Sequence, residues 1–173
     1  MPYSMFQASI PVFELGLNAL SGVLDAGAAF AAAKKIDPAV LLRTRLAPDM
    51  FDLTRQVQVA TDQARRGSAR LAGVEAPSYA DDETTIEQLK ARIAGTVAFL
   101  KTLDAAKIDA AADRDITFPI GSANAQMKGT DYLTHFVLPN FYFHLTAAYI
   151  VLRHCGVELA KRNFLGAIPL KRS

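Results

Sequence analysis

The sequence predicts an all-α four-helix bundle with a small β-hairpin between the third and fourth helices. Apolar residues recur at alternating steps of four and three over residues 4–34, the spacing of a helix that buries one face. Three further segments of helical period follow, separated by proline, glycine and polar runs. With 173 residues, 51% hydrophobic and 21% charged, the chain is long and apolar enough for one core. Residues 1–173 are therefore expected to form a single domain.

The first helix is expected over residues 4–34. Its buried seam consists of Phe6, Ile10, Phe13, Leu17, Leu20 and Leu24. Gly27 and Ala31 continue the same phase, and their small side chains would let a neighbouring helix approach closely. Pro11 is expected to kink the helix or to mark an irregular first turn, and Asp37-Pro38 ends the segment.

The second helix is expected to begin at Pro48, with Asp49 and Asp52 near its positive end, and to stop at Gly73. Its apolar stripe is Leu53, Val57, Ala60, Ala64 and Leu71. The connection that follows, GVEAPSYADDE, is long for a tight helical hairpin, so we expect it to cross the end of the bundle.

The third helix has a clear start signal in Thr84-Thr-Ile-Glu87, which reads as a capping box. Beyond it, Ile116, Phe118 and Ile120 alternate before Gly121-Ser122, a pattern typical of a β-hairpin. The fourth helix is expected from Thr130 to His154, ending at Gly156. The apolar tail after it should pack back on the bundle.

Charge and cysteine content bear on partners and location. The net charge is only +2 and the basic residues form scattered pairs, so we expect no nucleic-acid binding. A single cysteine and an N-terminus without a positively charged start favour a soluble cytoplasmic protein. Residues 132–152 lack charged residues and are long enough to cross a bilayer, but their polar residues favour a core helix over a membrane span.

All three histidines lie on the expected fourth helix. His135, His144 and His154 are nine and ten residues apart, which places them too far apart to share one metal. Asn140 and His144, in contrast, are four residues apart and face one way. On the second helix a polar row of Asp49, Gln56 and Gln63 runs beside the apolar stripe. Such a row either lines a cavity or forms a solvated boundary, and the sequence leaves both open.

The run from Asn140 to Gly156 resembles the last helix of the DinB/YfiT-like superfamily of bacterial four-helix bundles. That superfamily shows H-x-x-x-H, an aliphatic stretch, Leu-Arg and a glycine. Here the matching letters are Asn140-x-x-x-His144, Leu152-Arg153 and Gly156. The whole chain is similar to one uncharacterised bacterial branch, through RLAPDMFDLTRQVQVATD, ARLAGVEAP, MKGTDYL, HFVLPNFYFH and LRHCGV.

The resemblance implies a site but not its activity. Superfamily members bind a divalent metal through three histidines, one on the second helix and two on the last. In this chain His144 matches one of them, Asn140 replaces another, and Gln56 is the best match on the second helix. Amide oxygens are weak ligands for transition metals, so the metal triad is expected to be lost. A divalent metal held by His144, Asn140 and Gln56 is the disfavoured alternative.

The leading hypothesis is a bundle that binds a small polar or anionic molecule, or a partner, around Gln56, Asn140 and His144. The phenols of Tyr132 and Tyr149 and the guanidinium of Arg153 are candidates to complete this pocket. A second interpretation is that the three side chains only satisfy one another as a buried network. The third is an enzyme, either a metal-dependent hydrolase or thiol transferase, or a metal-free acid/base catalyst built on His144. A catalytic role requires His144 to reach a solvent-connected cavity. The resemblance also leaves a homodimer open, for which Gly27 and Ala31 are candidates.

Overall fold

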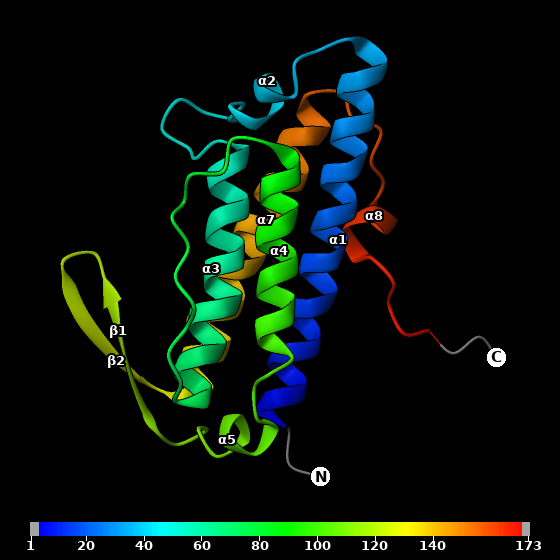
Figure 1. Ribbon diagram of the computed structural model, residues 1–173. Coiled ribbons are helices and arrows are strands. Elements are labelled where there is room, and N and C mark those ends of the chain that lie inside the picture. Colours follow the sequence, from blue (N-terminus) through cyan, green and yellow to red (C-terminus); the bar gives the residue numbers. More distant parts are fainter. Residues whose placement is uncertain (1–3, 171–173) are drawn as a thin grey trace.

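Four long helices form the bundle in the computed structural model, which describes residues 4–170 (Figure 1). They are α1 (Met5–Lys34), α3 (Leu53–Ala72), α4 (Ile86–Leu100) and α7 (Leu138–His154). The shorter elements are α2 (Pro38–Leu42), α5 (Ala105–Asp109), β1 (Asp115–Ile120), β2 (Ala123–Lys128), α6 (Gly129–Asp131), the π-helix η1 (Tyr132–Val137) and α8 (Lys161–Leu165). The prediction of a four-helix bundle with a hairpin before its last helix is confirmed.

The connection between α3 and α4 runs along the bundle, so the prediction that it crosses one end was wrong (Figure 1). It returns from the end of α3 to the level of its start, which makes α3 and α4 parallel. The side chains show this register: Gln58 on α3 donates to Glu83 in the connection at 2.8 Å. Arg92 on α4 donates to Thr61 on α3 at 2.7 Å. A long crossover of this kind is an established variant of four-helix topology.

Helix α1 provides much of the core. Five of its six predicted seam residues are buried and Phe6 is partly buried, while the helix is continuous through Pro11. Gly27 is buried against α7, where an added Cβ would lie 3.2 Å from the Leu152 side chain, and Ala31 is also fully buried. These two small residues thus serve packing within the chain. Within residues 4–170, α1 is the helix long and apolar enough to match a membrane span by length and composition.

Two helix starts differ from the prediction. Helix α3 begins at Leu53, because the Asp52 side chain caps it by accepting from the Arg55 N–H at 2.9 Å, and not at Pro48. The segment before it, residues 43–52, is a turn-rich connection. In α4 the capping box uses Thr85 and Gln88, one residue later than predicted. Helix α3 does end at Gly73, which adopts the left-handed conformation there (φ 68°).

The hairpin and the last helix complete the fold. Strands β1 and β2 pair antiparallel, with Ile120 opposite Ala123 across the Gly121-Ser122 turn. Ile116 and Phe118 are buried while Ile120 is exposed. The chain then passes through η1 into α7, whose first turn contains Pro139. The tail forms α8, which packs on α1 as expected of an apolar tail.

Candidate functional site

His144 lies in the middle of α7 and is buried, with 8% of its surface exposed. Its ring is held between two phenylalanines that are themselves largely exposed. Phe51, from the connection before α3, stacks on it with ring centroids 6.1 Å apart and planes at 24°. Phe143 meets it edge-on, with centroids 5.1 Å apart. The imidazole therefore sits below an aromatic surface layer.

Gln56 fixes the orientation and the tautomer of this ring. His144 Nδ1 lies 2.7 Å from Gln56 Oε1, and Gln56 Nε2 donates to the backbone oxygen of Phe51 at 3.2 Å. Because that carbonyl can only accept, the Gln56 amide nitrogen must face it and the amide oxygen must face the ring. His144 Nδ1 therefore carries the proton and donates it to Gln56, and a neutral ring leaves Nε2 as a bare lone pair.

The Nε2 atom has no hydrogen-bond partner within the described residues 4–170. The fully enclosed polar side-chain atoms without a partner in that part of the chain are Arg65 Nε and Ser68 Oγ. His144 Nε2 is not one of them, so it keeps contact with solvent-accessible space. It can accept one hydrogen bond from a bound molecule.

The surroundings keep His144 neutral. Burial lowers the pKa of His144 from 6.5 to about 4, and the positive charge of Arg55 contributes to the same shift. Arg55 is close to the site, since its guanidinium carbon lies 5.8 Å from the centre of the Phe51 ring. At neutral pH the site therefore offers a hydrogen-bond acceptor and not a cation.

A cavity of about 210 Å³ opens beside this imidazole. Its lining residues are Asp49, Met50, Phe51, Gln56, Phe143 and His144. Asp49 is exposed, whereas Gln56 is buried, so the polar groups lie at both the mouth and the floor of the cavity. The cavity places His144 beside open space, and within residues 4–170 the ring has one hydrogen-bond partner, Gln56.

The structure places the other predicted site residues elsewhere. The Asn140 amide turns back to donate to the Phe136 oxygen at 2.7 Å. Tyr132 lies at the start of η1, twelve residues before His144, and accepts from Arg70 at 3.0 Å. Tyr149 and Arg153 also line no part of the His144 cavity. Tyr149 packs against Phe164, and the exposed Arg153 donates to the Val157 oxygen. Of the six residues, Gln56 and His144 come together.

Comparison with known proteins supports the fold at the level of family. A family model described as a domain of unknown function, DUF1993, matches residues 5–165. The chain belongs to this family. A crystal structure of a DinB family member protein from Shewanella denitrificans is 40% identical to this DUF1993 protein and superposes with a TM-score of 0.91. The match covers 97% of this chain and 95% of the other. No curated protein matches the chain.

The residues of this DUF1993 protein do not fit the divalent metal that DinB-like bundles are expected to hold. The site has one imidazole, and the Gln56 oxygen is already the acceptor for His144 Nδ1. The Asn140 nitrogen is bonded to the backbone and its side chain lines no part of the cavity. Within residues 4–170, no three His, Cys, Asp or Glu side chains converge on one point. One nitrogen and neutral amides are a poor set for zinc or nickel.

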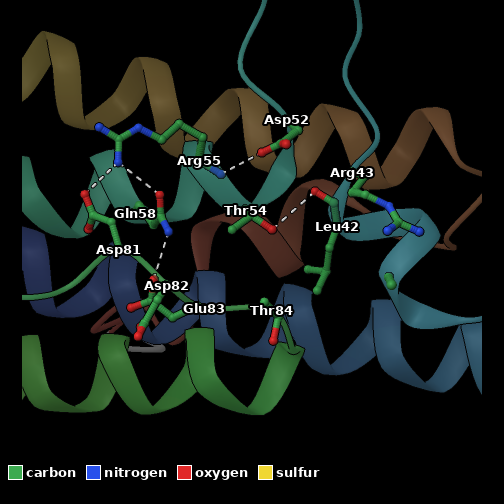
Figure 2. A pocket seen from close by; sticks show the side chains of 11 residues that line it. Leu42, Arg43, Asp52, Thr54, Arg55, Gln58, Asp81, Asp82, Glu83 and Thr84 are labelled. Atoms are coloured by element: carbon green, nitrogen blue, oxygen red, sulfur yellow. Dashed lines mark hydrogen bonds and ion pairs between the residues drawn. The ribbon is translucent and has the colours of Figure 1, made fainter.

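A second, larger hollow of about 480 Å³ lies between α2, the start of α3 and residues 81–84 (Figure 2). Three of its charged groups, Arg55, Asp81 and Glu83, already have protein partners. Arg55 donates to Asp81 at 2.8 Å and to Gln58 at 3.0 Å. Arg92, just beneath, donates to Asp81 at 2.7 Å and to Glu83 at 3.0 Å. These contacts hold the long connection on the bundle, so this hollow is a product of the fold's ionic network.

Sequence reasoning missed the aromatic and apolar part of the His144 site. Met50 and Phe51 lie in a segment that was predicted to be helical, and Phe143 was taken only as part of the last helix. The available signal was the run FYFH, in which an aromatic residue adjoins the histidine on an exposed face of the helix. Tertiary contact between residues 50–51 and α7 has no local sequence signature.

Proposed function

We propose that this DinB-like protein binds a small polar molecule at the Gln56–His144 site, as a binding protein without a metal cofactor. The observation that carries the proposal is the lone pair on His144 Nε2, unpaired within the described chain and held beside a cavity by the hydrogen bond from Nδ1 to Gln56. Buried polar groups are normally paired, so an acceptor kept free at a cavity is suited to a ligand.

The acceptor character of the site selects the ligand. The site favours a neutral molecule with an O–H or N–H donor over an anion. The unprotonated Nε2 of a neutral ring accepts a hydrogen bond from such a donor, and its lone pair repels a negative charge. The Asp49 carboxylate at the cavity also disfavours an anion. The nearest cation, Arg55, is already bonded to Asp81 and Gln58. A hydroxyl, phenol or amide is therefore the expected functional group.

An acid/base enzyme built on His144 is the second candidate, supported by the same free nitrogen. General bases act best when their pKa lies near the working pH. A pKa of about 4 makes His144 a weak base at neutral pH, so its protonation behaviour favours ligand binding over proton abstraction.

The proposal is tested with phenol and benzoate, which share a ring and differ in offering a donor or a negative charge. Ligand-observed NMR at pH 7 measures binding to the unmodified chain, to His144→Phe and to His154→Phe. His154 is an exposed histidine at the end of the same helix and serves as the matched control. We expect phenol to bind, benzoate to bind at least about tenfold more weakly, and His144→Phe to weaken phenol by about tenfold. Tighter binding of benzoate than of phenol, or phenol binding unchanged in His144→Phe, would overturn the proposal.

A further inference from the structure

A groove of about 380 Å³ adjoins the His144 cavity. Met50 and Phe143 line both, so the two spaces are neighbours on the surface. The groove lies between the connection before α3, which contributes Leu46 and Met50, and one face of α7. The α7 residues on that face are Tyr142, Phe143, Thr146, Ala147 and Ile150.

The chemistry of the groove differs from that of the cavity. None of the described residues that line it is charged. Four of them are large apolar side chains left exposed on the surface: Leu46, Tyr142, Phe143 and Ile150, with Phe143 59% exposed. Contiguous exposed apolar side chains on a single chain are unusual and mark sites of interaction. Here they lie beside the cavity that holds the His144 acceptor.

We infer that the groove holds the apolar body of the ligand whose donor group binds His144, so that the ligand is an amphipathic small molecule: an aromatic or alkyl group carrying one neutral hydroxyl or amide. This inference rests on the proposed function. The two spaces together give the arrangement usual for small-molecule sites, a mainly apolar surface with a few convergent polar groups. Because Met50 and Phe143 line both spaces, a small molecule that binds His144 would also contact the groove, which favours such a ligand over a protein partner.

The test uses three probes: phenol, 2-naphthol and 2-methoxynaphthalene. The second adds a ring to the first, and the third removes the donor from the second. The chain contains no tryptophan, so naphthalene fluorescence reports binding with little interference from the protein. The variants are Ile150→Glu, which places a charge in the groove, and His144→Phe. Ile120→Glu is the matched control, since Ile120 at the hairpin tip is 49% exposed and Ile150 is 43% exposed.

We expect 2-naphthol to bind about tenfold more tightly than phenol, because the second ring buries additional apolar area in the groove. Ile150→Glu should weaken 2-naphthol by about tenfold and leave phenol within about twofold, and Ile120→Glu should change neither. 2-Methoxynaphthalene should bind more weakly than 2-naphthol. Far-UV circular dichroism of each variant confirms that the bundle is folded.

The possible outcomes test the groove inference and the proposed His144 site separately. If phenol and 2-naphthol bind equally and both depend on His144 but not on Ile150, the groove inference is overturned and the proposed site stands. If 2-naphthol and its methyl ether bind equally and survive His144→Phe, the hydrogen bond to His144 is overturned. If Ile150→Glu leaves 2-naphthol unchanged but dissociates a dimer, the groove is a contact between copies and the inference fails.

Discussion

His144 should make the stability of the protein depend on pH between about 6.5 and about 4. Its pKa is 6.5 in the reference state and about 4 in the folded protein. Above pH 6.5 the ring is neutral in both states and the shift has no effect on the free energy of unfolding. As the pH falls, the unfolded chain takes up a proton that the folded chain does not, so the folded state loses stability. Linkage gives a loss of about 2 kcal/mol between pH 7 and pH 5, and of about 3 kcal/mol by pH 4.

The assay is urea unfolding, followed by far-UV circular dichroism at pH 7, 6 and 5, for the unmodified chain and for His144→Phe. Phenylalanine fills similar space and does not titrate, but it leaves Gln56 without its partner and should cost about 1–3 kcal/mol at pH 7. The free energy of unfolding of the unmodified chain, minus that of His144→Phe, should then be about 2 kcal/mol lower at pH 5 than at pH 7. His154→Phe should follow the unmodified chain. A difference that stays constant within about 0.5 kcal/mol from pH 7 to pH 5 would refute the account of a neutral, desolvated His144.

Three further predictions concern the frame that holds the site, and all are measured by urea unfolding. Gly129→Ala should destabilise the protein by about 3 kcal/mol or more, because the new Cβ would lie 1.9 Å from a backbone oxygen of the preceding loop. Gly22→Ala, where the new Cβ has nothing within 4 Å, should stabilise it by about 0.5–1 kcal/mol. Equal effects of the two substitutions on the free energy of unfolding would contradict this packing. Arg92→Met should cost about 2–4 kcal/mol, because it removes the hydrogen bonds that this buried guanidinium donates to Asp62, Asp81 and Glu83. Lys90→Met, at an exposed pair, should cost under about 1 kcal/mol. A loss for Arg92→Met as small as that for Lys90→Met would show that Arg92 does not hold the connection on the bundle. Tyr132→Phe should cost about 1 kcal/mol by removing the bond from Arg70 and should leave phenol binding unchanged; reduced binding would place Tyr132 in the site.

The stability that the Arg92 network contributes should be lost in acid. Hydrogen bonds and charge from arginine hold the pKa of Asp81 and Glu83 below their usual values, against the opposing effect of burial, which is the largest single contribution. Their stabilisation is complete above the unfolded values of 3.8 and 4.5 and is lost as the pH falls through the lower folded values. This loss begins below about pH 4.5, outside the range of pH 7 to pH 5 used for the His144 assay, so the two effects can be separated there.

Local signals predicted most of the fold. Helical period, Gly73 as a stop and the Gly121-Ser122 turn all depend on neighbouring residues, and each was read correctly. The predicted start of α3 at Pro48 was wrong because Pro48 and Asp49 are also good helix-start residues. The helix begins at Leu53 instead, because Asp52 caps it and residues 50–51 lie against α7. The run along the bundle from α3 to α4 depends on Arg92, whose partners lie 9 to 34 residues away in sequence.

The site was predictable where residue type and helical phase were enough. Gln56 was matched to His144 by resemblance to the superfamily, and the two side chains do meet. Asn140 shares the phase of His144, but its amide has a nearer acceptor in the backbone of Phe136, which lies within the unpredicted π-helix. Tyr132 and Tyr149 were grouped with the site by residue type alone, and packing directs their rings toward Phe118 and Phe164.

The protonation state of His144 is the most direct test of the central claim. Long-range ¹H–¹⁵N correlation NMR distinguishes protonated from unprotonated ring nitrogens, and the His144 signals are assigned by their loss in His144→Phe. The account predicts a neutral ring at pH 7, with the proton on Nδ1 and a bare Nε2, and no change until the pH falls well below 6. A proton on Nε2, or on both nitrogens at pH 7, would contradict the free acceptor on which the proposed function depends.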